Sequence, residues 1–203
     1  SISYPEYKYT YFAPNSHWKG KPIEVSKIPK ECDGEAYALT MQYQDAFIAH
    51  LDSGKKWIDY RGHRYATYFP IDFDASDHLE DCKELIISFV EGICKEHDID
   101  PTWILIYWSG NKGFHLCIPS ILFNITPRTD LESKFKLLHN RLIAGHSIEN
   151  SNYKDTSIYS RNSWFRTPNS INKKSNLYKI PLSWEELKTL SIADIKGLAI
   201  APR

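Results

Sequence analysis

The chain has 203 residues, of which 42% are hydrophobic and 25% charged, ordinary proportions for a globular protein with one large core. Its 25 Lys and Arg residues balance 25 Asp and Glu residues, which excludes a uniformly basic coat for nucleic acid but not a local basic groove. The sequence shows neither a signal peptide nor an apolar run of membrane length, so we expect no membrane association.

The cysteines and the first residues bear on the compartment and the domain organisation. Cys32, Cys82, Cys94 and Cys117 lack the spacing of a zinc knuckle. We therefore expect free thiols, no structural zinc, and a reducing, cytoplasmic location. The chain begins with Ser-Ile-Ser-Tyr rather than Met, and we expect residues 1–203 to form one domain of a longer protein.

Apolar spacing and turn residues predict a mixture of helices and strands. Residues 1–32 are rich in Tyr and Pro, which predicts irregular structure or short strands. Helices are predicted over 33–54, 77–97 and 129–144, with Thr129 and Glu132 at the spacing of a capping box. A short helix is predicted after Ser183, and a last turn near Ser191. Strands are predicted over 64–74, 103–108, 114–118, 157–160, 164–167 and 177–182. Residues 103–118 form a predicted hairpin, residues 145–154 a predicted loop, and the fold class is α+β (mixed α/β).

Two aspartates end the apolar strand predicted over 64–74. Side chains alternate along a strand, so Asp72 and Asp74 lie on one face and Phe73 on the other. Adjacent carboxylates repel one another unless a proton or a cation lies between them, and Mg²⁺ and similar hard ions prefer oxygen ligands. An isolated Asp-x-Asp is more often a solvated strand end, so the remaining motifs decide between the two interpretations.

A glycine-rich turn and a later polar segment supply the complementary groups. The turn Ser109-Gly-Asn-Lys-Gly113 is followed by a strand with His115, and its backbone N–H groups, Lys112 and His115 suit a phosphate. Alone it is a hairpin loop with a satisfied histidine. Asp155 is suited to complete a set of three carboxylates, and Arg166 to clamp a phosphate. The alternative for this pair is a surface ion pair of little energetic value.

Together the three motifs match the requirements of nucleotidyl transfer. Two divalent ions about 3.5–4 Å apart activate an attacking 3′-hydroxyl and stabilise a leaving pyrophosphate, while basic side chains and N–H donors hold the triphosphate. The order Ile-Asp-Phe-Asp74, Ser109-Gly-Asn-Lys-Gly-Phe-His-Leu, and Asp155 followed by Arg166 resembles the three motifs of the archaeo-eukaryotic primase superfamily. More narrowly, it resembles the catalytic domain of a primase–polymerase of the plasmid, phage or CRISPR-associated kind.

The resemblance covers roughly residues 60–185, and residues 1–60 form an N-terminal α/β portion without a match. It implies a two-layer fold with an RRM-like half and a catalytic core over 61–190. It implies two Mn²⁺ or Mg²⁺ ions, and as partners NTPs or dNTPs, a single-stranded DNA template or primer–template duplex, and associated replication, repair or CRISPR domains. The site residues that it implies are metal ligands at Asp72, Asp74 and Asp155, and nucleotide contacts at Ser109, Lys112, Gly113, His115, Arg166 and Lys179.

Several features depart from the family pattern or leave alternatives open. Asp74 stands where many relatives carry Glu, and neither a zinc module nor a helical accessory domain is evident. We also expect Arg61, His63 and Arg64 to support the template or the triphosphate. A metal-dependent nuclease or phosphodiesterase and a non-catalytic RRM-like nucleic-acid binder are the alternatives. The absence of a closely spaced His-x-His pair counts against the nuclease. The absence of a clear aromatic stacking motif on a strand counts against the nucleic-acid binder.

Overall fold

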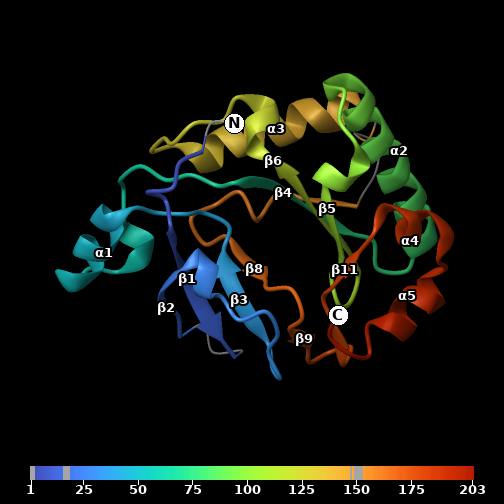
Figure 1. Cartoon of the computed structure of the whole chain (residues 1–203), viewed down its shortest axis with the longest axis horizontal. Helices are drawn as coiled ribbons and strands as arrows, with labels where there is room; N and C mark the ends of the chain where they lie inside the picture. The colour runs from blue at the N-terminus through green and yellow to red at the C-terminus, as the bar shows by residue number, and fades with distance from the viewer. Residues whose placement is uncertain (1–2, 16–18, 147, 149–152) are drawn as a thin grey trace.

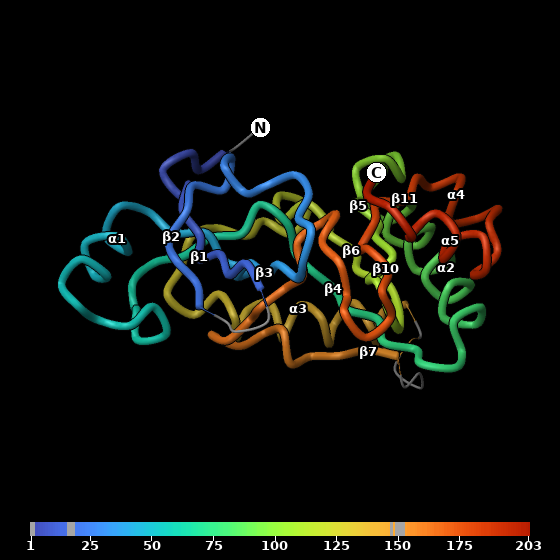
Figure 2. Tube along the Cα trace, turned by 90° about the horizontal axis from the view of Figure 1, so that it is seen from below, coloured from blue at the N-terminus to red at the C-terminus, as the bar shows by residue number. Residues whose placement is uncertain are grey.

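The computed structural model describes residues 3–15, 19–146, 148 and 153–203. Its elements are helices and antiparallel strands, which confirms the α+β class. Figure 1 shows a smaller sheet, made of three N-terminal strands and β8, on one side and a larger sheet covered by helices on the other. Figure 2 shows the same division from below. In the described part of the chain, no helix is both long and apolar enough to cross a bilayer.

The smaller sheet has the strand order β2-β1-β3-β8. Its strands are β1 (Tyr9–Pro14), β2 (Lys21–Glu24), β3 (Ala36–Leu39) and β8 (Trp164–Arg166). The helix predicted over 33–54 is therefore wrong in its first half, and only α1 (Asp45–Asp52) is helical. Residues Ala36–Leu39 pair with β1 on one side and β8 on the other. These long-range ladders override a local apolar spacing that suits a helix equally well.

The larger sheet has the order β11-β5-β6-β4-β7, with every neighbouring pair antiparallel. It contains β4 (Tyr68–Asp74), β5 (Leu105–Trp108), β6 (Gly113–Pro119), β7 (Lys154–Asp155) and β11 (Ile180–Leu182). The predicted hairpin is confirmed as β5 and β6. Between β10 (Leu177–Tyr178) and β11 the chain is interrupted at Lys179, whose N–H donates to Ser170 O, so the strand predicted over 177–182 is divided in two.

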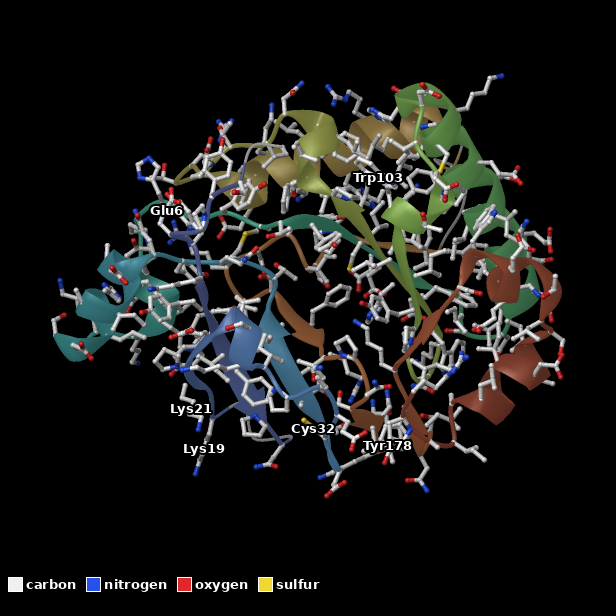
Figure 3. All side chains as sticks on the ribbon, in the orientation of Figure 1. Glu6, Lys19, Lys21, Cys32, Trp103 and Tyr178 are labelled. Atoms are coloured by element: carbon white, nitrogen blue, oxygen red, sulfur yellow. The ribbon has the colours of Figure 1, made fainter. Side chains whose placement is uncertain are left out.

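Alternation along β4 gives the larger sheet one apolar and one polar face. Phe69 packs edge-to-face on Phe135 of α3 (Leu131–Gly145), and Phe73 packs on Phe89 of α2 (Leu79–His97). These helices match the predictions over 77–97 and 129–144 within a few residues. Asp72 and Asp74 consequently face away from the helices, toward the smaller sheet. Side chains from both sheets project into the space that the ribbon leaves open between them (Figure 3).

The C-terminal part of the chain packs beside α2. It contains β9 (Ile171–Asn172), paired with β10, then α4 (Trp184–Thr189) and α5 (Ile192–Leu198). Ser183 accepts the N–H of Glu186 as predicted, and Ser191 forms a capping box with Asp194. Lys83 of α2 donates to Leu190 O, and Glu80 accepts the N–H of Ile192, which attaches α5 to α2.

Three further predictions are corrected. Asp130 rather than Thr129 precedes α3, and it makes no side-chain cap because both of its carboxylate oxygens accept from Arg128. The Glu132 carboxylate binds Arg64 instead of completing a capping box. Residues 157–160 form turns rather than a strand, since Asp155 Oδ1 accepts the N–H of Ser157. β4 begins at Tyr68 rather than at residue 64. The loop predicted over 145–154 includes residues 147 and 149–152, which lie outside the described residues.

Candidate active site

A row of functional side chains crosses the polar face of the larger sheet. Asp72 of β4 lies directly opposite His115 of β6 and directly opposite Asp155 of β7. Side chains of directly opposed residues lie on the same face, and Asp74 lies on that face two residues further along β4. The pairing of β7 with β4 thus brings together acids that are about eighty residues apart in the sequence.

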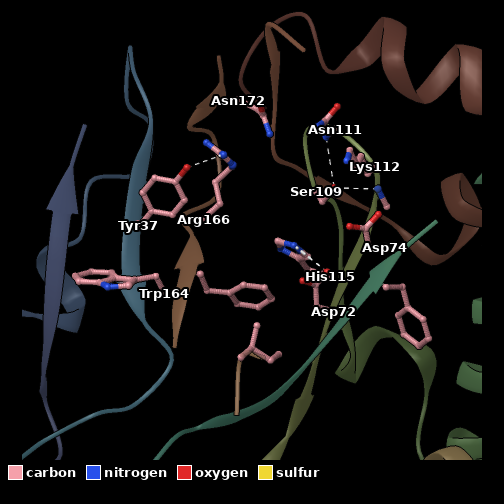
Figure 4. A pocket seen from close by; sticks show the side chains of 14 residues that line it. Tyr37, Asp72, Asp74, Ser109, Asn111, Lys112, His115, Trp164, Arg166 and Asn172 are labelled. Carbon is pink, nitrogen blue, oxygen red and sulfur yellow. Dashed lines mark hydrogen bonds and ion pairs between the residues drawn. The ribbon is translucent and has the colours of Figure 1, made fainter. Parts of the chain in front are cut away.

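The row borders a cleft of about 240 Å³ between the two sheets. Figure 4 shows Asp74, Lys112 and Ser109 on the side of the larger sheet, and Tyr37, Trp164 and Arg166 on the side of the smaller one. The larger sheet also contributes Asp72, Gly113 and His115 to the lining of the cleft. Asn111 and Asn172 line one end of the cleft. Of the predicted metal ligands and nucleotide contacts, Asp155 and Lys179 do not line this cleft, and neither do Arg61, His63 and Arg64.

The charge of Asp72 is unfavourable in this environment. Only 21% of its side chain is exposed. Burial, together with the neighbouring carboxylates of Asp155 and Asp74, raises the pKa of Asp72 to about 7 against the opposing charge of Lys179. A cation bound beside Asp72 would offset both the free-energy cost of burying its negative charge and its repulsion by the neighbouring carboxylates.

His115 is held between the acid row and the smaller sheet. Its Nε2 lies 3.5 Å from Asp72 Oδ1, and its ring stacks on Phe165 with centroids 4.0 Å apart. Burial, followed by the charges of Lys179 and Arg166, lowers the pKa of His115 well below its usual range, so the imidazole is neutral at pH 7. Its Nδ1 is buried without a partner among the described residues.

The Ser109–Gly113 turn is organised around a hydroxyl. Ser109 Oγ accepts the N–H of Gly113 at 3.1 Å and that of Asn111 at 3.4 Å. Two N–H groups that were candidates for an anion nest are therefore directed at Ser109, and the hydroxyl proton is left to donate toward the cleft. Lys112 O accepts the N–H groups of Ala75 and Ser76, which ties the turn to the end of β4 while the Lys112 side chain is exposed.

Glycine is required at both ends of this turn. Gly110 has φ +100°, a conformation that other residues rarely adopt. Gly113 lies opposite Asp74, and a Cβ there would lie 1.7 Å from the carbonyl oxygen of Phe73. The role of Gly113 is therefore the close approach of β6 to β4 beside the acids.

Arg166 reaches the cleft from the edge strand β8 and is held by three partners. Its Nη1 donates to Ile171 O at 2.6 Å, and its Nη2 donates to the Tyr37 hydroxyl at 2.8 Å and lies 3.5 Å from Glu35 Oε1. The guanidinium carbon lies 4.8 Å from the centre of the Tyr37 ring. A planar guanidinium fixed in this way is preorganised for an anionic ligand.

Lys179 lies behind the cleft rather than in it. Only 2% of the residue is exposed, its Nζ donates to the carbonyl oxygen of Arg166, and the ammonium lies over the rings of Phe165 and Tyr107. Burial lowers the pKa of Lys179 to about 8; Cys117 and Asp72 act against this, and Arg166 adds to it. This geometry suits a residue that positions β8 and offsets the acids, not one that touches a phosphate.

The donor set fits a hard divalent cation. Asp72, Asp74 and Asp155 are oxygen donors of the kind that Mg²⁺ and Mn²⁺ prefer, and the raised pKa of Asp72 marks a place where positive charge is favoured. Asp155 Oδ1 is meanwhile occupied by the N–H of Ser157. Within the described ranges, no three His, Cys, Asp or Glu side chains are placed so that they already surround an ion.

Several residues that line the cleft were not predicted from the sequence, and Arg64 was predicted to reach a ligand although it does not. Tyr37 was not predicted because the helix expected there is a strand, and Trp164 and Phe165 belong to the edge strand β8 without any motif to mark them. Asn172 lies in the polar run after Arg166, which was a weak signal. Arg64, predicted to support template or triphosphate, is 2% exposed and pairs with Glu132 at 2.8 Å, so it is unavailable to a ligand.

No family model matches the chain, and no curated protein matches it significantly. The resemblance to primase–polymerases therefore stays a prediction.

Proposed function

We propose that this chain is the catalytic domain of a template-directed nucleotidyltransferase of the primase–polymerase kind. The observation that carries the proposal is the position of Asp72, directly opposite both Asp155 and His115, with Asp74 beside it and the Ser109–Gly113 turn at the same cleft. Two carboxylates, Asp72 and Asp74, line a cleft that also holds two cationic side chains, and Asp155 lies directly opposite Asp72 on the neighbouring strand. This arrangement matches an anionic ligand accompanied by divalent cations.

Each side chain has a distinct task in this proposal. Asp72, Asp74 and Asp155 would hold one or two divalent ions, which supply charge neutralisation and activation of the attacking hydroxyl when bound. Lys112 and Arg166 bind the triphosphate from opposite walls of the cleft. The Ser109 hydroxyl donates to a phosphate oxygen, and neutral His115 donates its single N–H, either to Asp72 or to the substrate.

The surroundings of the cleft support binding rather than covalent catalysis. Nucleotidyl transfer needs no nucleophile from the protein, because the 3′-hydroxyl of the growing strand attacks the incoming nucleotide. We propose NTPs or dNTPs as substrates, single-stranded DNA or a primer–template duplex as partner, and fused or associated replication, repair or CRISPR domains. The two-layer primase fold with an RRM-like half belongs to the same proposal.

A primer-extension assay tests it. A labelled primer annealed to a longer template is incubated with NTPs or dNTPs and with Mn²⁺ or Mg²⁺, and the products are separated on a denaturing gel. The wild type should extend the primer, and Asp72→Asn and Asp74→Asn should each lose at least about 100-fold in rate. Asp194→Asn, on α5, is the matched control and should retain activity. Wild-type protein that extends no primer with either metal, or that shortens the oligonucleotide instead, would overturn the proposal.

A further inference from the structure

A second cavity opens on the same face of the larger sheet as the acids. It has a volume of about 590 Å³ and lies between the start of β4, the end of β6 and the N-terminal strands. Tyr68 and Pro119, which are paired across β4 and β6, line it. Tyr68 lies four residues before Asp72, on the same face, which places it roughly 13 Å along the strand from the acid row. We call this cavity the tyrosine groove, after Tyr4, Tyr7, Tyr65 and Tyr68.

The tyrosine groove has a packed aromatic wall and one open ring. Tyr4, Tyr7 and Tyr65 pack on one another with ring centroids 4.8 to 6.4 Å apart. Tyr68 belongs to no such packed group among the described rings, and it is 37% exposed. A rigid aromatic wall with one accessible ring suits a flat aromatic ligand that stacks on it.

The charge of the groove indicates what kind of aromatic ligand it would take. Lys8 is exposed and is, among the residues that the structure describes, the one charged side chain that borders the groove. The polar groups of Gln42 are already used, since Oε1 accepts from Thr67 and Nε2 donates to Tyr7 O. A ring platform beside a lysine, with the Gln42 amide already paired, matches sequence-independent stacking of a nucleobase with a phosphate near Lys8.

We infer that the tyrosine groove binds an unpaired nucleotide of single-stranded DNA whose neighbouring nucleotides reach the acid row. The inference rests on the proposed function and deepens it by assigning a place for the template. Continuity supports it, because the groove and the candidate active site open on one face of the same two strands. An unpaired base is required because a base within a duplex already has both faces stacked.

The inference is tested by DNA binding without catalysis. Fluorescence anisotropy measures the affinity of the protein for a fluorescein-labelled oligothymidylate in EDTA, with no nucleotide present. Tyr68→Ala should weaken binding about tenfold, and Tyr68→Phe should bind like the wild type because the ring is kept. Lys8→Ala should make the slope of log affinity against log salt concentration less steep, by the amount expected for the loss of about one phosphate contact. Trp103→Ala, at an aromatic residue that is 52% exposed and outside the groove, is the control and should change nothing.

An abasic oligonucleotide of equal length isolates the stacking contribution. Wild-type protein should prefer the oligothymidylate to the abasic strand, and Tyr68→Ala should lose that preference. Equal loss of affinity for both strands, or unchanged binding by Tyr68→Ala, would overturn the inference. So would a wild-type dimer that Tyr68→Ala converts to monomer, because the groove would then be covered by a second copy.

Measuring DNA affinity and primer extension on the same variants distinguishes failure of the tyrosine-groove assignment from failure of the polymerase assignment. Asp72→Asn should keep full affinity for the oligothymidylate while losing primer extension. If the wild type prefers the oligothymidylate through Tyr68 but extends no primer, the groove stands and the polymerase assignment fails. If the wild type extends primers while Tyr68→Ala binds DNA normally, the groove assignment fails and the polymerase assignment stands.

Discussion

The ammonium of Lys179 lies 2.8 Å from the carbonyl oxygen of Arg166, in a position that is almost completely buried. The contact crosses from the C-terminal strands to the edge strand β8, and the same ammonium lies over the ring of Phe165, on which His115 stacks. Lys179 therefore joins the two walls of the cleft from behind. A buried charge of this kind has consequences for stability that can be measured.

Stability should depend on pH through Lys179. Its pKa of about 8 in the folded protein lies below the ordinary value of 10.5, so between these values the unfolded chain binds more protons and stability rises with pH. Relative to Lys179→Met, wild-type protein should gain about 2 kcal/mol in free energy of unfolding between pH 7.5 and 9.5. Urea denaturation at both pH values measures this. Lys196→Met, at an exposed position, serves as the control; a parallel change in Lys179→Met and the wild type would contradict the prediction.

Removal of a carboxylate should stabilise the metal-free protein. Asp72→Asn relieves the repulsion from Asp155 and Asp74, and we expect the free energy of unfolding in EDTA to rise by about 2 kcal/mol at pH 7.5. Added Mn²⁺ should raise the melting temperature of the wild type, because a ligand bound only by the folded state stabilises it, and should affect the variant little. Thermal unfolding with and without Mn²⁺ gives both values. Identical Mn²⁺ responses would show that Asp72 holds no ion.

Gly113→Ala should disrupt the site through the backbone. The added Cβ would meet the carbonyl oxygen of Phe73, so β6 must separate from β4 beside Asp74, at a cost of about 3 kcal/mol or more. Gly145→Ala is the matched control, since nothing lies within 4 Å of a Cβ at that position. Denaturant titration of both variants, followed by primer extension of any folded protein, distinguishes them. A Gly113→Ala protein with wild-type stability and activity would refute this close approach.

The buried pair of Arg64 and Glu132 should act on stability and not on the cleft. Arg64 contacts Tyr60 O and the ring of Tyr43 as well as Glu132, so it connects the 60–64 segment to α3. Glu132→Leu alone leaves a buried guanidinium unpaired and should cost about 3–5 kcal/mol. The double variant Arg64→Met/Glu132→Leu should recover most of that loss. Denaturant titration of the wild type, Arg64→Met, Glu132→Leu and the double variant gives a double-mutant cycle. Additive changes in the free energy of unfolding would show that the two residues are not coupled.

The local sequence was sufficient for elements whose pattern is long or carries its own caps. Nineteen residues of consistent apolar spacing predict α2, and the Ser183 cap predicts the start of α4. Alternation along β4 likewise separates Asp72 and Asp74 from Phe73. Short segments such as Ala36–Leu39 were not decided locally, because four residues fit either period and partners far along the chain select the strand.

Which residues carry charge, which strand presents two acids to one face, and where glycine permits a turn can all be read from the chain alone. Those properties depend on side-chain chemistry and on the period of the backbone. Which of these groups meet is set by the fold. Pairing of β7 with β4 places Asp155 opposite Asp72, whereas burial removes Lys179 and Arg64 from the cleft and β3 brings Tyr37 into it. Such encounters depend on strand register and on the packing of distant segments, which local periodicity does not encode.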